Sequence, residues 1–312
     1  MPIHHPSAMP VEAIESLICR PGKIYVDGTL GGSGHAKRIC ERLAGDGHLI
    51  GIDRDPAAVE NAREVLEPFA CHVHLFHDSF DNLPGILLQL NFPAVDGILL
   101  DLGISLYQLE ASGRGFSFQR DEPLDMRMNP EADRTAESLV NTLEADQLSS
   151  IFFTYGEERW ARRIAAGIVE KRSVSPIRTS RQLADIVTAA VPARAAAKQR
   201  IHPATRVFMA LRIVVNRELD ALTAFMDTAL ACLNPGGRLC VMSFHSLEDR
   251  IVKHRMRAWA TGCVCPREIP VCVCGKTPVA RLVNRKVMRP TAAETAENPL
   301  GRGTRLRVVE KL

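Results

Sequence analysis

The stretch Lys23-Ile-Tyr-Val-Asp-Gly-Thr-Leu-Gly-Gly-Ser-Gly-His35 decides the fold of this chain, together with Gly51-Ile-Asp-Arg-Asp-Pro56 downstream. A short apolar run ends on Asp27 and opens into a glycine-rich turn and a helical pattern, and a second apolar run ends on Asp53. Glycines let a backbone turn sharply and approach a ligand closely, and a carboxylate about twenty residues further on can accept hydrogen bonds from ribose hydroxyls. The pattern indicates a nucleoside pocket, although such turns also serve packing alone.

The charges around this turn favour a nucleoside without phosphates. The spacing Gly28-x-x-Gly31-Gly32-x-Gly34 does not match the Gly-x-Gly-x-x-Gly of dinucleotide-binding proteins, and no Gly-Lys-Ser/Thr ending makes it a P-loop. Asp27 at the start of the turn repels a phosphate and attracts an amino group. An adenosine with a zwitterionic amino-acid tail, such as S-adenosylmethionine, fits these charges.

Composition indicates a globular protein with a full hydrophobic core. The chain has 312 residues, of which 46% are hydrophobic and 24% are charged, enough for one large domain or two smaller ones. No apolar run approaches the ~18 to 20 residues of a membrane span, and the first residues lack the basic-then-apolar pattern of a secretory signal. We therefore expect a cytoplasmic protein without a membrane-spanning segment.

Charge is distributed unevenly along the chain. Residues 1–150 carry 11 Lys and Arg against 23 Asp and Glu, whereas residues 151–312 carry 28 against 13. Within residues 151–213, twelve basic residues face four acidic ones. Because phosphate contacts dominate affinity for nucleic acids, we expect the second half to contact a polyanion, first of all a nucleic acid. The alternative is that these Lys and Arg side chains lie on solvent-exposed helix faces and contact no partner.

Short apolar runs bounded by Gly, Pro or Asp alternate with helical spacing in the first third of the chain. The expected strands are 24–27, 49–53, 73–76 and 95–102, and the expected helices are 34–44, 55–67 and 80–90. This alternation predicts an α/β fold with a mostly parallel sheet and helices on both faces. Ligands of such sheets bind at the carboxyl ends of the strands, where Asp27, Asp53 and Asp101 are expected.

The alternation stops after Asp101, and helical patterns follow at 136–142, 145–153, 158–171 and 180–190. We therefore expect residues 1–108 and 205–312 to form the sheet domain, and residues 109–204 to form an inserted helical domain that recognises the nucleic acid. The last part predicts one long helix from Thr205 to Leu233 and a strand over 238–244. Two further runs, 285–288 and 304–309, predict an antiparallel pair at the sheet edge.

Seven strings of the chain resemble one family of enzymes. They are Asp27-Gly-Thr-Leu-Gly-Gly-Ser-Gly-His35, Asp101-Leu-Gly-Ile-Ser-Leu-Tyr-Gln-Leu109, Arg114-Gly-Phe-Ser-Phe118, Pro123-Leu-Asp-Met-Arg-Met128, Tyr155-Gly-Glu-Glu158, His202-Pro-Ala-Thr-Arg206 and Ser243-Phe-His-Ser-Leu-Glu-Asp-Arg250. They are similar to strings of the RsmH (MraW) family, bacterial S-adenosylmethionine-dependent methyltransferases that modify N4 of a cytosine in small-subunit ribosomal RNA. The resemblance spans nearly the whole chain.

The resemblance implies a Rossmann-like class I methyltransferase sheet with an antiparallel edge strand, S-adenosyl-L-methionine as cofactor, and 16S rRNA near the decoding centre of the small ribosomal subunit as substrate. It leaves a homodimer open. It also implies a set of cofactor contacts, namely Ser33, Gly34, His35, Asp53, Phe80, Asp101 and Gln108. Asp53 suits the ribose hydroxyls, Phe80 the apolar adenine face, and Asp101 the polar methionine tail. Ser33 departs from a frequent Gly, and Leu106-Tyr107 from a frequent Ser-Pro.

Methylation of an exocyclic amine requires an acceptor for its protons, because the lone pair of cytosine N4 is delocalised into the ring. Three groups are candidates: the Asp101 carboxylate, a carbonyl of the following turn, and the Ser105 hydroxyl. Our hypothesis is that Asp101 and Ser105 are the catalytic residues. His245 either contacts the target base or holds the loop before a helix that starts near Ser246, and we favour the second role.

The nine cysteines fall into two groups. Five lie singly in apolar surroundings, as is typical of reduced, buried thiols: Cys19, Cys40, Cys71, Cys232 and Cys240. The others form two Cys-x-Cys pairs, Cys263-Val-Cys265 and Cys272-Val-Cys274, whose thiolates suit a tetrahedral Zn²⁺. The spacing is tighter than the usual Cys-x₂₋₄-Cys, and the resemblance implies no required metal. We expect no metal among the catalytic residues, and zinc at these cysteines stays open.

Two other functions compete with this interpretation. A methyltransferase that acts on a protein or a small-molecule amine predicts turnover without RNA, and the basic insertion argues against it. A non-catalytic RNA-binding or assembly factor with a vestigial pocket predicts no binding of S-adenosylmethionine. The intact Asp53, Asp101 and Gln108 argue against that function.

Overall fold

The computed structural model describes residues 7–197, 201–266, 271 and 273–312. Contacts divide the chain into two compact units: unit 1 is formed by residues 1–103 and 219–312, and unit 2 by Ile104–Glu218. Each unit has hydrophobic clusters of its own. The inserted unit thus begins and ends at other residues than the sequence boundaries 109 and 204, and the helix α11 (Ala204–Asn216) belongs to it.

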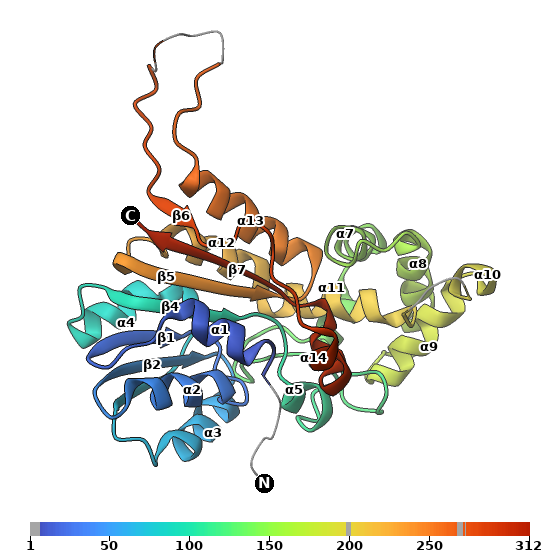
Figure 1. Ribbon diagram of the computed structural model, residues 1–312. Helices are drawn as coiled ribbons and strands as arrows, with labels where there is room; N and C mark the ends of the chain where they lie inside the picture. The colour runs from blue at the N-terminus through green and yellow to red at the C-terminus, as the bar shows by residue number, and fades with distance from the viewer. Residues whose placement is uncertain (1–6, 198–200, 267–270, 272) are drawn as a thin grey trace. The chain divides into compact units, whose positions relative to one another are not determined.

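Unit 1 contains a seven-stranded sheet in the order β3-β2-β1-β4-β5-β7-β6 (Figure 1). The strands are β1 (Lys23–Asp27), β2 (Gly47–Asp53), β3 (His72–His77), β4 (Val95–Asp101), β5 (Leu233–Ser243), β6 (Ala280–Leu282) and β7 (Arg305–Lys311). The first five strands pair in parallel, and β7 runs antiparallel to both β5 and β6. The predicted α/β class, with a mostly parallel sheet and antiparallel strands at one edge, is confirmed.

Helices cover both faces of this sheet. They are α1 (Pro10–Leu17), α2 (Gly34–Leu43), α3 (Pro56–Leu66), the 3₁₀ helix η1 (Phe80–Asn82), α4 (Leu83–Leu90), α12 (Glu218–Thr228), α13 (Ser246–Ala260), α14 (Ala292–Glu297) and η2 (Pro299–Gly303). Leu17, Ile39 and Leu66 of α1, α2 and α3 belong to one buried cluster, and Ile86 of α4 and Phe225 of α12 to another. Strands covered on both faces read as continuous apolar runs, which explains why the sequence located β1, β2 and β4.

Two elements of the chain differ from the sequence expectation. The long helix expected from Thr205 to Leu233 is wrong, because Arg217 adopts a left-handed backbone with φ of 50° and separates α11 from α12. The strand expected over 285–288 is also wrong: β6 is formed by Ala280–Leu282 instead, and Met288 makes only an isolated bridge to Leu306. Neither a left-handed residue nor a bridge of this kind leaves a periodic pattern in the sequence.

Unit 2 is built from α5 (Leu106–Glu110), α6 (Ala136–Thr142), α7 (Ala145–Gly156), α8 (Ala161–Arg172), α9 (Ser180–Ala190), α10 (Ala193–Ala196) and α11. Thr135 and Thr179 begin α6 and α9 with reciprocal capping boxes, which satisfy backbone N–H groups that a helix start leaves unpaired. Phe152, Ile164 and Leu211 lie in its core. Among the described residues of the whole chain, no helix is long and apolar enough to cross a membrane.

Candidate functional site

Three aspartates end three neighbouring strands of unit 1. Asp27 ends β1, Asp53 ends β2 and Asp101 ends β4, and β1 lies between the other two strands in the sheet. Because these strands are parallel, the three side chains lie at the same edge of the sheet, where ligands of doubly wound folds bind. Asp27 is fully buried, whereas Asp53 and Asp101 are half-buried.

Asp27 and Asp101 form a charge cluster with His35, which lies in the first turn of α2. His35 Nε2 lies 3.4 Å from Asp101 Oδ2, an ion-pair distance. Oδ1 of Asp27 accepts a hydrogen bond from the Thr29 N–H at 3.1 Å. Within the described part of the chain, Asp27 Oδ2, Asp101 Oδ1 and His35 Nδ1 are buried and have no hydrogen-bond partner. Because unsatisfied buried polar atoms are costly, this cluster suits a polar ligand that donates hydrogen bonds and carries positive charge.

The pKa values in this cluster are displaced. Burial raises the pKa of Asp27 from 3.8 to about 7; the nearby Asp101 and Asp53 add to this shift, and His35 opposes it. Burial disfavours the charged imidazole of His35, but the carboxylates of Asp101 and Asp27 outweigh it and raise the pKa of His35. Burial therefore makes the ionised form of Asp27 unfavourable, and a cationic ligand that binds beside this carboxylate would stabilise its negative charge.

Asp53 is fixed by the backbone of its own loop and of the glycine-rich turn. Its Oδ2 accepts a hydrogen bond from the Gly31 N–H at 2.9 Å, and its Oδ1 accepts one from the Asp55 N–H at 2.8 Å. Burial raises the pKa of Asp53 to about 6, although these two N–H groups pull it down. Each carboxylate oxygen has a second lone pair, so the side chain is oriented and can still accept further hydrogen bonds.

The glycine-rich turn packs closely against residues of β4, of η1 and of the segment before α1, which leaves no room for a Cβ at two of its glycines. A Cβ at Gly28 would lie 2.4 Å from Leu100 Cδ2 and 3.2 Å from Phe80 Cβ, and one at Gly34 would lie 2.2 Å from Ser7 Oγ. Ser33 stands in a left-handed conformation with φ of 64°, which explains why glycine suits this position elsewhere. Its hydroxyl accepts a hydrogen bond from Asn61 Nδ2 at 3.2 Å.

Phe80 lies at the start of η1, which follows β3. Its ring packs edge-on against Phe225 with a centroid separation of 5.5 Å, and the Arg54 guanidinium lies 5.6 Å from its centroid. The ring is half-buried, so one part of it is available to a flat apolar ligand.

Ser105 and Gln108 belong to unit 2 and contact each other. Ser105 Oγ accepts a hydrogen bond from the Gln108 N–H at 3.2 Å, and Gln108 Oε1 accepts one from the Ser105 N–H at 3.1 Å, so the two residues form a capping box at the start of α5. The structure therefore shows a local structural role for both. The catalytic role of Ser105 and the cofactor contact of Gln108 stay predictions.

His245 caps a helix of unit 1. It precedes α13, and Glu248 reaches back so that its Oε2 accepts a hydrogen bond from the Phe244 N–H at 2.8 Å. His245 Nε2 lies 3.1 Å from Glu248 Oε1. This geometry supports the structural role that the sequence favoured for His245.

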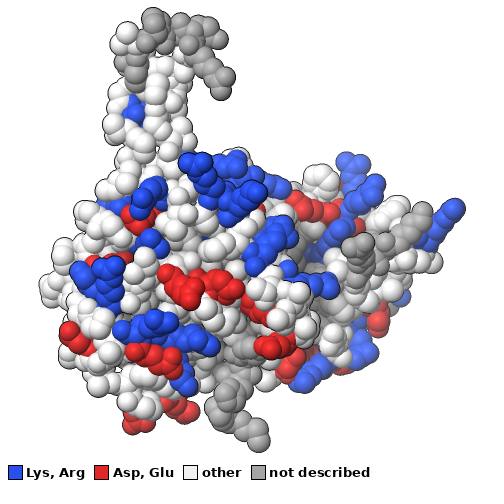
Figure 2. Space-filling view, in the orientation of Figure 1, with Lys and Arg blue, Asp and Glu red and all other residues white. Residues whose placement is uncertain are grey.

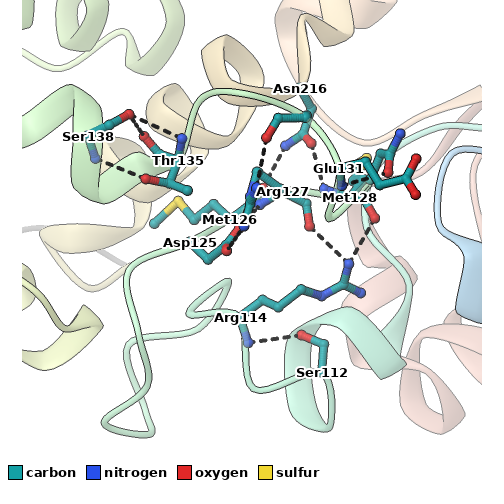
Figure 3. Close-up of polar contacts among 12 residues, drawn as sticks. Ser112, Arg114, Asp125, Met126, Arg127, Met128, Glu131, Thr135, Ser138 and Asn216 are labelled. Carbon is teal, nitrogen blue, oxygen red and sulfur yellow. Dashed lines mark hydrogen bonds and ion pairs between the residues drawn. The ribbon is translucent and has the colours of Figure 1, made fainter.

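Two of the specific strings shape a loop in unit 2. Arg114 donates hydrogen bonds to the carbonyls of Arg127 and Met128 at 2.9 and 2.8 Å, and Arg127 forms an ion pair with Asp125 (Figure 3). Asn216 of α11 accepts a hydrogen bond from the Met128 N–H at 2.7 Å. The strings thus have a structural explanation within this unit.

The surface of unit 2 carries exposed basic side chains, visible in blue in Figure 2. Exposed residues of this kind in α8 to α10 and the adjoining loops are Arg159, Arg162, Arg163, Lys171, Arg178, Arg181 and Arg194. Among the residues that the structure describes, none of these seven forms an ion pair. They are therefore available to an anionic partner.

Sequence reasoning did not assign a role to Thr29. Its hydroxyl accepts a hydrogen bond from the Asp101 N–H at 2.7 Å, and its N–H donates to Asp27. It thereby ties the ends of β1 and β4 together. In the sequence, the only indication of a role for Thr29 was its position two residues after Asp27 and before the glycines. The contact of its hydroxyl became visible only when the structure showed that β1 pairs with β4.

Comparisons with known proteins give a consistent result. A model of the MraW methylase family matches residues 2–312. The chain is 53% identical over 312 residues to the ribosomal RNA small subunit methyltransferase H of Desulfosudis oleivorans and 51% identical over 312 residues to the protein of that name in Geobacter sulfurreducens, with 100% of both chains covered in each case. The crystal structure of Aeropyrum pernix fibrillarin with bound S-adenosyl-L-methionine is similar with a TM-score of 0.40 and 7% identity, covering 93% of this chain and 67% of that chain. Structural similarity at that level carries no argument about function.

Proposed function

The chain belongs to the MraW methylase family, and we propose that it transfers a methyl group from S-adenosylmethionine to N4 of a cytosine in the 16S rRNA of the small ribosomal subunit. The observation that carries this proposal is the cluster of Asp27, Asp101 and His35, in which Asp27 Oδ2, Asp101 Oδ1 and His35 Nδ1 are buried without a hydrogen-bond partner in the described structure. The names of the relatives support an rRNA substrate. The motif resemblance supports the cytosine N4 position near the decoding centre.

The residues present fit S-adenosylmethionine. Asp27 and Asp101 offer carboxylate oxygens to the ammonium group of its methionine part, Asp53 offers oriented oxygens to the ribose hydroxyls, and Phe80 offers a half-buried ring to the adenine. Ser33, Gly34 and His35 begin α2 close to these groups and complete the predicted contacts. When bound, this cofactor supplies a methyl group on a positively charged sulfur, already activated for displacement.

The chain's own task is to position the amine and to receive its proton. Asp101 is suited to this task because Thr29 fixes its backbone N–H, and its Oδ1 lacks a hydrogen-bond donor within the part of the chain that the structure covers. The Ser105 hydroxyl oxygen accepts the Gln108 N–H with one lone pair and keeps a second lone pair that can accept a hydrogen of the amine. We retain both as the proposed catalytic residues.

The exposed arginines and lysine of α8 to α10 support contact with an RNA backbone, because none of them is neutralised by an ion pair inside the described chain. The same proposal includes the assembled small subunit as the substrate and a homodimer as the form of the protein. It also includes a cytoplasmic location, where bacterial ribosomes are found. Sedimentation of the purified protein tests the homodimer.

The deciding experiment is transfer of tritiated methyl groups from S-adenosylmethionine to isolated small subunits, followed by digestion to nucleosides and chromatography. We expect label in N4-methylcytidine with subunits as substrate. Naked 16S rRNA serves as the parallel substrate, and Asp27→Asn as the variant with an impaired site. Label in protein, or equal turnover with a free amine and no RNA, would contradict the proposal.

A further inference from the structure

The described residues between α13 and β6 in unit 1, namely 261–266, 271 and 273–279, form an arm without a hydrophobic core. The arm leaves α13 at its end and returns into β6, and its two stretches run out from the sheet side by side (Figure 1). Its base is closed by a hydrogen bond from the Val279 N–H to the Trp259 carbonyl at 2.9 Å. None of its described residues is buried, and the side chains of Val264 and Val273 are 59% and 76% exposed. Segments that bury no apolar surface need another source of stability, such as a metal or a cross-link.

Three thiols of the arm converge on one point. Cys263 and Cys265 lie on the outgoing stretch and Cys274 on the returning one, and all three sulfurs lie within 4.8 Å of one another. The Sγ atoms of Cys263 and Cys274 are 3.8 Å apart. A disulfide would require about 2.05 Å, whereas two sulfurs on one tetrahedral Zn²⁺, each at about 2.3 Å, lie about 3.8 Å from each other.

Backbone N–H groups of the arm point at these sulfurs. The Val264 N–H donates to Cys274 Sγ at 3.5 Å, the Cys265 N–H to Cys263 Sγ at 3.4 Å, and the Val273 N–H to Cys265 Sγ at 3.4 Å. Two of these hydrogen bonds connect one stretch of the arm to the other. Donors aimed at sulfur stabilise thiolates, and such partners orient the ligands of metal sites.

We propose that Cys263, Cys265 and Cys274 hold a structural Zn²⁺ that gives the arm its shape. Soft thiolate ligands select zinc among the common divalent ions, and each thiol that binds releases its proton to solvent. Three thiolates fill three corners of a tetrahedron, and the fourth corner is not assigned by the described residues. Cys272, which the sequence grouped with these cysteines, lies outside those residues.

The test measures metal in the full chain, purified under reducing conditions without added zinc. We expect about one zinc per chain by mass spectrometry. After exchange with Co²⁺, we expect a thiolate-to-cobalt charge-transfer band together with the visible bands of tetrahedral cobalt. Cys263→Ser and Cys274→Ser should each weaken Co²⁺ binding at least about tenfold. The matched control is Thr277→Val, a change of similar size at an exposed position of the same arm, which should leave the metal content unchanged.

A second readout needs no variant. Removal of zinc with a chelator should expose the arm to trypsin at Lys276, which is exposed on the returning stretch, and re-addition of zinc should restore protection. Wild-type protein that contains no zinc and gives no charge-transfer band with Co²⁺ would overturn the proposal. So would iron or copper in place of zinc, or thiols already joined in a disulfide.

Discussion

His35 Nε2 lies 3.4 Å from Asp101 Oδ2, and the two residues belong to different elements, the first turn of α2 and the last residue of β4. The fully buried Asp27 contributes to the same electrostatic environment, since its carboxylate raises the pKa of His35. The positive charge of the protonated His35 imidazole therefore offsets part of the negative charge of Asp27 and Asp101.

Asp27→Asn should raise the thermal stability of the protein and weaken its binding of S-adenosylmethionine. Burial raises the pKa of Asp27 from 3.8 to about 7, so the folded protein retains a proton that the unfolded chain releases between these values. Stability is therefore lost as pH rises through this interval. At pH 8 the variant should unfold at a higher temperature than the wild type, by roughly 2 to 4 °C for each kcal/mol of charge burial that is removed.

The difference should shrink near pH 5, where Asp27 is protonated in the folded wild type. Calorimetric melting at both pH values measures it. At pH 8 the same variant should bind S-adenosylmethionine at least about tenfold more weakly, which corresponds to about 1.4 kcal/mol. A variant that is both less stable and equally able to bind the ligand would contradict this role for Asp27.

Binding of S-adenosylmethionine should depend on pH. The ammonium group of the ligand requires an ionised partner, so affinity should fall as pH drops below about 7, the pKa of Asp27. A further decrease is expected below about 6, where Asp53 takes up a proton. Isothermal titration between pH 8 and pH 5.5 measures both steps, and Asp27→Asn should remove the upper one. A flat profile in the wild type would show that neither carboxylate meets the ligand in its charged form.

Asp101→Asn should lower turnover about a hundredfold or more at saturating cofactor, because the amide cannot receive a proton. The variant keeps the size of the side chain and its backbone contact with Thr29. Single-turnover methyl transfer measures the effect, and full turnover would exclude proton transfer to this carboxylate.

Ser105 requires a pair of variants, since its side chain caps α5. Ser105→Ala removes both the hydroxyl and the cap, which costs about 1 kcal/mol of stability, whereas Ser105→Thr keeps both. If the hydroxyl acts on the substrate, Ser105→Ala should lose turnover at a temperature well below unfolding and Ser105→Thr should retain most of it. Equal activity of the two variants would leave only the capping role.

Replacement of Arg162 and Arg163 by Ala should weaken binding to the RNA substrate and leave the binding of S-adenosylmethionine unchanged. Both side chains are exposed on α8, and neither forms an ion pair within the described structure. Each lost phosphate contact should reduce the slope of log affinity against log salt by about 0.7 to 0.9. Filter binding over a salt series measures the slope, with Glu170→Gln on the same helix as a control that removes a negative charge. An unchanged slope would place the RNA contact elsewhere.

The sequence predicted the elements whose pattern is local. β1, β2 and β4 were located because each is a continuous apolar run that ends on an aspartate. The helix expected from residue 55 is α3, and Asp55 caps it by accepting a hydrogen bond from the Ala57 N–H at 3.1 Å. The break at Arg217 and the short strand β6 were not predictable, because a left-handed residue and a three-residue edge strand are determined by tertiary packing.

The same distinction applies to the candidate site. Asp53, Asp101 and the start of α2 follow from where strands and helices end in the sequence. The contact between His35 and Asp101 and the link from Thr29 to Asp101 depend on which strands become neighbours in the sheet. No spacing within the chain encodes that neighbourhood directly, so these contacts required the structure.

The position of unit 2 between β4 and β5 has a consequence for biosynthesis. β4 pairs with β5, but the ribosome adds Ile104–Glu218 before it reaches β5. The inserted unit, whose buried cluster consists of its own residues, is thus complete as a chain while the sheet still has an open edge at β4. During translation the helical unit can fold first, and the exposed edge of the nascent sheet must wait for the last third of the polypeptide to cover it.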